Sequence, residues 1–158
     1  MDVIASSIIA AGYDPNPGFT GVLMGPPEPV KILRVKRWGL GSIRQVVSEI
    51  LAAYKGRSRS IEIKSGDPLD PIRLCRKCTI IMLDEAGSDI SQLGDRICGN
   101  TAFLLGGHTG FPGELYEDLR RASHVLVSLG PISLQTYQAI LYTAWRRATL
   151  CGPSSRRE

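Results

Sequence analysis

The chain has 158 residues, of which 43% are hydrophobic and 22% charged, and its formal net charge is +4. This length and composition favour one globular domain with its own core over a disordered chain. No run of about 18 apolar residues occurs, so the sequence holds no candidate membrane span. The apolar N-terminus lacks a preceding basic region, which argues against a signal peptide and favours a cytoplasmic protein.

Residues 1–65 are predicted to form two helices and three short strands. The helices are expected over residues 1–12 and 42–54, where apolar side chains recur at helical spacing. Ser42 and Gln45 form a capping-box pattern at the start of the second helix. The strands are expected at residues 20–24, 31–35 and 61–63.

From residue 79 onward, apolar runs alternate with glycine or polar loops. Each run is typical of a buried parallel strand, and each loop leads toward a helix, the last of which is expected from Ser133. Leu83, Gly106 and Leu129 follow one another at intervals of 23 residues, one strand–helix unit apart. The predicted class is therefore α/β, with a mostly parallel sheet and helices on both faces. The three loops should share one edge of the sheet, where such sheets bind ligands.

Four cysteines are present, and two of them form one CxxC motif, Cys75 to Cys78. No second pair stands at the spacing of a zinc ribbon, so no metal site is predicted. The two cations inside the motif favour a thiolate, which leaves a redox role open. We expect free thiols at the start of a buried strand, because disulfides belong chiefly to oxidising compartments and hyperthermophiles.

Basic residues are concentrated in the middle of the chain. Residues 31–77 carry twelve Lys or Arg and four Asp or Glu, whereas residues 78–124 carry three and seven. A basic block suits a polyanion such as RNA, although a solvated surface of mixed charge explains the same distribution. The candidate phosphate contacts are Lys31, Arg34, Lys36, Arg37, Arg57 and Arg59.

Two glycine motifs resemble the knotted methyltransferases of the SPOUT superfamily. They read Gly106-Gly107-His108-x-Gly110-Phe111-Pro112 and Ser128-Leu129-Gly130-Pro131-Ile132-Ser133-Leu134. Neither fits the GxGxxG dinucleotide fingerprint. The match is closest to the archaeal tRNA pseudouridine N1-methyltransferase family, which acts at T-loop position 54. Three further segments agree in the same order (1–3, 22–31 and 83–90), so the resemblance extends to about residue 147.

The resemblance implies one methyltransferase domain over residues 1–158, with a deep C-terminal trefoil knot. It further implies S-adenosylmethionine as cofactor, tRNA as substrate and a homodimer with active sites at its interface. Backbone groups in a tight glycine turn suit adenine recognition, because glycine lets the main chain approach closely. The residues that match the cofactor loops are Leu83, Gly106, Leu129, Gly130, Pro131, Ile132, Ser133, Leu134 and Ala139.

Transfer of a methyl group to a uracil-type N1 also requires loss of a proton, and His108 and Asp84 are the candidate bases. A hydrogen bond that stabilises the loop explains His108 equally well, and a cap on the following segment explains Asp84. The family has Gly-Asp-His where this chain has Gly107 before the histidine, and it has an extra strand before the segment that matches Met1. Two alternatives stay open: a non-catalytic RNA-binding homodimer, and methylation of another RNA nucleotide.

Overall fold

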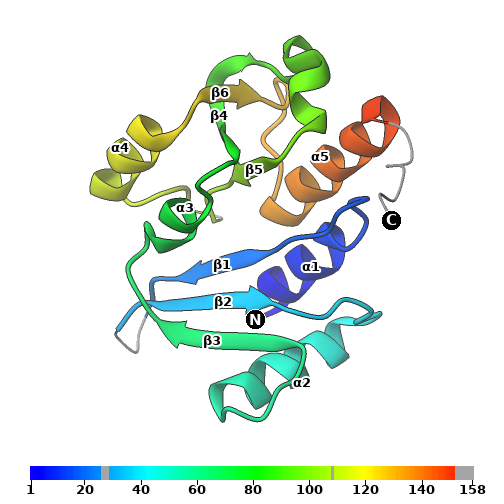
Figure 1. Cartoon of the computed structure of the whole chain (residues 1–158), viewed down its shortest axis with the longest axis vertical. Helices are drawn as coiled ribbons and strands as arrows, with labels where there is room; N and C mark the ends of the chain where they lie inside the picture. Colours follow the sequence, from blue (N-terminus) through cyan, green and yellow to red (C-terminus); the bar gives the residue numbers. More distant parts are fainter. Residues whose placement is uncertain (26–28, 108, 152–158) are drawn as a thin grey trace.

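In the part of the chain that the structure describes, the strands form two separate three-stranded sheets (Figure 1). The structure is a computed structural model, and it describes residues 1–25, 29–107 and 109–151. Among these residues, no helix has the length and apolar character needed to cross a bilayer. In chain order the elements are α1 (Asp2–Ala11), β1 (Thr20–Leu23), β2 (Lys31–Val35), α2 (Ile43–Tyr54), β3 (Ile61–Ser65), α3 (Asp70–Leu74), β4 (Thr79–Asp89), the 3-10 helix η1 (Ile90–Cys98), β5 (Thr101–Leu104), α4 (Gly113–Ala122), β6 (Val125–Ser128) and α5 (Thr136–Cys151).

The N-terminal sheet, in the order β1-β2-β3, is antiparallel throughout. Leu33 in β2 lies opposite Gly21 in β1 and Ile63 in β3. Residues 24–30, which join β1 to β2, are too few for the crossover that a parallel pair requires. The prediction of one mostly parallel sheet is therefore wrong for this half of the chain. Helices α1 and α2 supply Ile8, Val46 and Ile50 to the core on this sheet.

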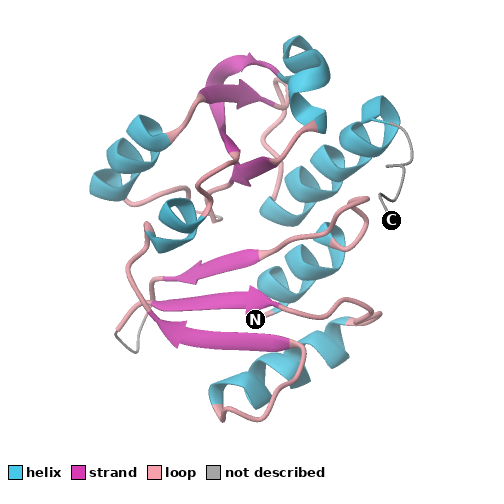
Figure 2. Ribbon diagram, viewed as in Figure 1, coloured by secondary structure: helices cyan, strands magenta, loops and turns pink. Residues whose placement is uncertain are grey.

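The C-terminal sheet, in the order β5-β4-β6, is parallel, so the predicted α/β class with a parallel sheet is confirmed for this half. Ile81 in the central strand lies opposite Phe103 in β5 and Val125 in β6. Figures 1 and 2 show α4 on one side of this sheet and η1 with α5 on the other. A second core cluster lies here, and its buried members are Ile81, Ile90, Leu93, Ile97 and Val127.

The predicted start of α2 is confirmed, with one change of partner. The Ser42 side chain accepts a hydrogen bond from the Gln45 backbone nitrogen at 3.3 Å. The Gln45 side-chain oxygen accepts from the backbone nitrogen of Gly41 at 3.0 Å, one residue earlier than a capping box requires. The last helix begins at Thr136, later than the expected Ser133, and α3 and η1 were not predicted.

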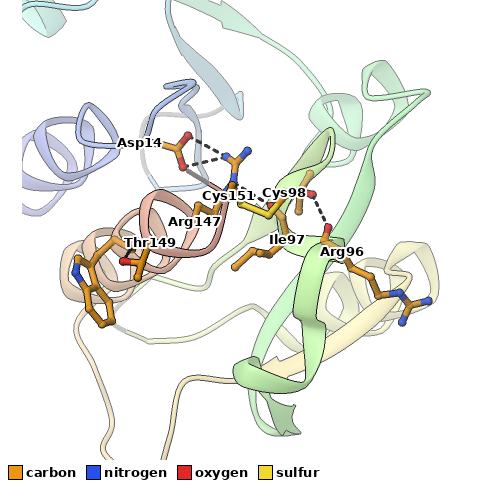
Figure 3. Close-up of a disulfide and its surroundings, with 9 residues drawn as sticks. Asp14, Arg96, Ile97, Cys98, Arg147, Thr149 and Cys151 are labelled. Carbon is orange, nitrogen blue, oxygen red and sulfur yellow. Dashed lines mark hydrogen bonds and ion pairs between the residues drawn. A yellow bond between two sulfur atoms is a disulfide. The ribbon is translucent and has the colours of Figure 1, made fainter. Parts of the chain in front are cut away.

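Helix α1 joins the two halves of the molecule, because it contributes to the N-terminal core and also contacts α5. The loop after α1 and the end of α5 are fastened by an ion pair, drawn in Figure 3. Arg147 Nη1 donates to both carboxylate oxygens of Asp14 at 2.9 Å, and the two side chains are only 14% and 13% exposed. Arg147 Nε also donates to the carbonyl oxygen of Ile97 at 3.1 Å.

All four cysteines are paired in disulfides, so the expectation of free thiols is wrong. Cys98 at the end of η1 is bonded to Cys151 at the end of α5 (Figure 3), and Cys75 is bonded to Cys78. The Cα–Cα distances of 5.3 Å and 5.4 Å lie in the range that a disulfide spans. Cys98 and Cys151 are 53 residues apart in the sequence, so only the packing of α5 on η1 reveals the pair.

Candidate functional site

Three loops meet at one edge of the C-terminal sheet, as the spacing predicts. We define the first loop as residues 84–88, the second as 105–112 and the third as 129–135, and together they form the three-loop edge. The second and third directly follow β5 and β6, the first interrupts β4 after Leu83, and β4 pairs in parallel with both neighbours. Carboxyl ends of parallel strands share one edge of a sheet, which is where open α/β sheets bind small ligands.

The first loop is an excursion within β4 that lies directly against β6. Leu83 pairs with Val127, the chain then leaves the ladder, and Ser88 pairs with Val127 again. A Cβ atom added to Gly87 would lie 2.4 Å from the Val127 nitrogen and 2.6 Å from the Leu126 carbonyl carbon. Only glycine fits between the loop and the strand, because any side chain would overlap the backbone.

Both carboxylate oxygens of Asp84 are engaged. Oδ1 accepts a hydrogen bond from the backbone nitrogen of Ala86 at 2.8 Å, and Oδ2 accepts from the Tyr116 hydroxyl of α4 at 2.8 Å. The hydrogen bond to Asp84, helped by desolvation, raises the pKa of Tyr116. The phenol therefore stays protonated and keeps donating at neutral pH. This arrangement agrees with the interpretation of Asp84 as a cap on its own loop.

The second loop is a tight glycine turn. A Cβ atom added to Gly106 would lie 2.9 Å from Cα and from the carbonyl carbon of Gly110. The Gly110 nitrogen donates to the Gly107 carbonyl at 2.9 Å, and Gly110 has φ of 75°, in the left-handed region. An added Cβ at Gly107 would meet no described atom within 4 Å. His108, one of the two candidate bases, lies outside the described residues.

The third loop begins with a second glycine turn. Gly130 has φ of 118°, and its nitrogen donates to the Ser128 hydroxyl oxygen at 3.2 Å. Ile132 is 75% exposed, which is unusual for a large apolar side chain and gives the edge an apolar surface. At the start of α5, Thr136 Oγ1 donates to the Gly106 carbonyl at 3.1 Å and so connects the third loop to the second.

The structure brings most of the predicted cofactor residues to the three-loop edge. Leu83 and Gly106 are half-buried there, and residues 129–134 range from half-buried to exposed. Ala139 differs, because it lies in the first turns of α5 and is only 7% exposed. Two cavities of the described chain lie elsewhere, one of about 250 Å³ between α1 and residues 37–41 and one of about 210 Å³ between α1 and α5.

The six predicted phosphate contacts do not form one cluster. Arg37 and Lys36 follow β2, where their backbone nitrogens donate to the Ser60 carbonyl, beside the loop that carries Arg57 and Arg59. We call these four exposed cations the basic end of the N-terminal sheet. Lys31 lies at the opposite end of β2 and donates to the Ser65 hydroxyl at 2.7 Å. Arg34 is exposed in the middle of the same strand.

Part of the charge at the basic end is neutralised within the protein. Lys36 and Lys64 both lie 2.9 Å from the same Glu62 oxygen. Hydrogen bonds from Lys64 and then Lys36 lower the pKa of this half-buried carboxylate. Arg57 and Arg59 are therefore the clearer candidates for contact with phosphate, since both side chains are exposed.

Sequence reasoning missed three residues that organise the three-loop edge. Gly87 was quoted as part of a motif, but its packing against β6 was not foreseen, although an isolated glycine next to an apolar run can mark a close backbone approach. The hydroxyls of Tyr116 and Thr136 have no local signal, because their partners are 32 and 30 residues away.

The fold defines an α/β protein whose parallel sheet carries three loops at one edge. It is similar to a crystal structure of Nep1 from Archaeoglobus fulgidus bound to S-adenosylhomocysteine, with a TM-score of 0.64 over 94% of this chain and 70% of that chain. The sequence identity of 15% makes this a likeness of fold.

Residues 72–148 match the model of a family described as putative SAM-dependent RNA methyltransferases. Two curated tRNA (pseudouridine(54)-N(1))-methyltransferases, from Methanosarcina acetivorans and Methanosarcina mazei, are 30% and 29% identical over 131 residues. These matches take in 75% of this chain and 62% of each relative, so the chain spans less than two thirds of their length. The resemblance seen in the sequence motifs is thereby confirmed.

Proposed function

We propose that the protein is an S-adenosylmethionine-dependent RNA methyltransferase that methylates N1 of a pseudouridine in the tRNA T-loop. The observation that carries this proposal is the three-loop edge, where two tight glycine turns and the Gly87 excursion lie at adjacent strand ends. The names of the family and of the curated relatives support the same reaction and substrate.

The residues at the edge suit a nucleoside-containing cofactor. Gly106 lets the backbone of the second loop fold tightly on itself, since a Cβ atom there would lie 2.9 Å from Gly110. Ile132 and Leu134 offer apolar surface for a base, while Leu83 lies in the central strand directly before the first loop. S-adenosylmethionine would supply an activated methyl group there. The protein's own part is to hold donor and acceptor in line and to exclude water.

Methylation of N1 also requires a group that accepts the N1 proton. Asp84 already accepts two hydrogen bonds, so acting as a base would require it to exchange the Tyr116 hydroxyl for the substrate. We propose that Asp84 acts chiefly as a structural cap. His108 remains the second candidate.

RNA would bind through the basic end of the N-terminal sheet. If Lys36, Arg37, Arg57 and Arg59 each neutralise one phosphate, log K falls with log salt at a slope of about −3. Replacement of Arg57 and Arg59 by alanine should reduce that slope by about 1.5. Arg121, an exposed arginine of α4 paired with Asp118, serves as the control for a change of charge alone. An unchanged slope in the double variant would contradict this RNA surface.

We propose that the chain forms a homodimer through α1 and α5. Val3, Tyr13, Leu141 and Trp145 are large apolar side chains on or beside these helices and are 44% to 70% exposed. The cavity of about 210 Å³ between the two helices belongs to the same surface. Leu141→Glu should give a monomer in sedimentation equilibrium, whereas Leu51→Glu on α2, at a similarly exposed position, should not. A dimer that survives the first change would contradict this interface.

We also propose the C-terminal trefoil knot that the resemblance implies. Its support is the close contact of the first loop with β6, where Gly87 has no room for a Cβ atom. The test is an experimental structure of the chain. A backbone trace that straightens into an unknotted line when its two ends are pulled apart would contradict the knot.

The decisive experiment for the reaction uses tritiated S-adenosylmethionine and two tRNA transcripts that differ only in pseudouridine or uridine at T-loop position 54. We expect label in the first and background in the second, with the methyl group mapped by mass spectrometry of nucleosides. Tight RNA binding without transfer would instead favour a non-catalytic RNA-binding homodimer. Label at another position would favour a methyltransferase with a different target nucleotide.

A further inference from the structure

We propose that Thr136 and Tyr116 are positioning residues. Their hydroxyl groups connect the three loops by hydrogen bonds and so preorganise the three-loop edge for cofactor binding. The inference rests on the proposed function, because it assigns a role in cofactor binding to two side chains that the sequence motifs do not include. Each hydroxyl connects a helix that follows one loop to the backbone or side chain of a different loop.

Thr136 connects the third loop to the second. It is the first residue of α5, directly after the third loop, and its Oγ1 donates to the Gly106 carbonyl at 3.1 Å. The other described threonine hydroxyls of α5 behave differently. Thr143 donates to the carbonyl of Ala139 and Thr149 to that of Trp145, each four residues earlier in the same helix. Thr136 has no carbonyl four residues earlier within α5, and its hydroxyl bonds to a different loop instead.

Tyr116 connects the second loop to the first. It lies in α4, which begins directly after the second loop, and its hydroxyl donates to Asp84 Oδ2 at 2.8 Å. The other oxygen of that carboxylate accepts a hydrogen bond from the Ala86 nitrogen. The Asp84 carboxylate is therefore the common acceptor for Tyr116 and for the backbone of the first loop. Hydrogen bonds to a carboxylate are stronger than those between neutral groups, which makes this a firm attachment.

The second loop needs such attachments because its described part is rich in glycine. Residues 105–112 include Gly106, Gly107 and Gly110, and ordering glycine is entropically expensive. Within the described part of this loop, the Gly110 nitrogen to Gly107 carbonyl bond is the backbone hydrogen bond that closes the turn. Without outside attachments, a cofactor would have to order the loop as it binds, and its affinity would fall accordingly.

The experiment measures the dissociation constant of S-adenosylhomocysteine by calorimetry. Thr136→Val keeps the side-chain shape but removes the hydroxyl, and a lost hydrogen bond of ordinary strength predicts about fivefold weaker binding. Thr136→Ser keeps a hydroxyl and should restore binding to within twofold of wild type. Thr149→Val is the matched control on the same helix, where the hydroxyl bonds locally, and it should change nothing.

Tyr116→Phe should weaken binding by about fivefold or more, since it leaves one Asp84 oxygen without its donor. Tyr54→Phe, an exposed tyrosine on α2, is its control. In the methyl-transfer assay, the positioning variants should raise KM for S-adenosylmethionine and leave kcat at saturation within twofold. A global loss of folding would instead lower both the melting temperature and kcat, so thermal melts accompany each variant.

Equal affinity of Thr136→Val and wild type would overturn the role of Thr136, as would failure of Thr136→Ser to restore binding. Equal affinity of Tyr116→Phe and wild type would do the same for Tyr116. A wild-type protein that binds no S-adenosylhomocysteine at millimolar concentration would contradict the proposed function instead. In that case, amide hydrogen exchange in residues 105–112 still tests whether the Thr136 hydroxyl orders the second loop. The exchange should be several times faster in Thr136→Val than in Thr149→Val, and equal rates would refute this role of Thr136.

Discussion

The backbone of Gly87 lies so close to the amide nitrogen of Val127 that a Cβ atom would come within 2.4 Å of it. This contact joins the excursion of β4 to the strand that carries the third loop. It also explains why the parallel ladder between β4 and β6 can resume at Ser88 after a gap. The architecture of the three-loop edge thus depends on one position that has no side chain.

Gly87→Ala should therefore destabilise the protein by about 3 kcal/mol or more, because neither backbone can move without breaking the ladder. The measurement is the free energy of unfolding in urea. Gly99→Ala is the control, since an added Cβ there meets no described atom within 4 Å and its φ is −76°. Equal stabilities of the two variants would mean that the first loop does not pack against β6 as described.

The ion pair between Asp14 and Arg147 should contribute measurably to stability, because both side chains are largely buried. Asp14→Asn leaves the guanidinium without its carboxylate and should cost about 2 kcal/mol. Asp118→Asn breaks an exposed Asp–Arg pair on α4, with Arg121 at 3.6 Å, and should cost less than about 0.5 kcal/mol. Chemical denaturation of both variants makes the comparison, and a cost for Asp118→Asn as large as for Asp14→Asn would contradict it.

The two disulfides should differ in their effect on stability. Cys98–Cys151 closes a loop of 53 residues, for which the chain-entropy estimate is about 4 kcal/mol. Cys75–Cys78 spans three residues and should contribute no more than about 2 kcal/mol. The double serine variants, melted without reductant, test this order. A larger drop in melting temperature for the short pair would contradict it.

A substitution at Gly107 tests whether a carboxylate at this position acts as a base. The family that this chain resembles has an aspartate there. An added Cβ meets no described atom within 4 Å, so Gly107→Asp should fold normally. If a carboxylate there acts as a base, the variant should transfer methyl groups at least tenfold faster, since general bases contribute about 10²-fold or more. Gly107→Asn is the control of equal size without charge. Equal rates for the two variants would exclude a base at this position.

The strands and the longer helices were predictable because their signals are local. The strands expected at residues 20–24 and 31–35 were placed to within one residue at each end, and α2 was recognised from its cap and its apolar spacing. Helices α3 and η1 escaped for a physical reason. The first has only five residues, and the second is interrupted by Gly94 with φ of 51°, so neither repeats an apolar pattern long enough to detect.

Pairing between distant segments was harder to foresee. The direction of the strands in the N-terminal sheet and the Cys98–Cys151 bond both depend on contacts between residues far apart in the sequence. The shared edge of β4, β5 and β6 was the exception, because parallel strands joined by helices leave one arrangement for their loops. The motifs located the loops, but nothing in them indicated the hydroxyl groups that connect one loop to the next.

The bond between Cys98 and Cys151 has a consequence for limited proteolysis. The second loop lies between these residues, so a protease that cuts the chain there produces two fragments that stay covalently joined. A gel without reductant would show one band of the full mass, and a gel with reductant would show two. The nicked protein would keep the end of α5 on η1, because the Cys98–Cys151 bond and the Arg147 to Ile97 hydrogen bond both lie outside the cut loop.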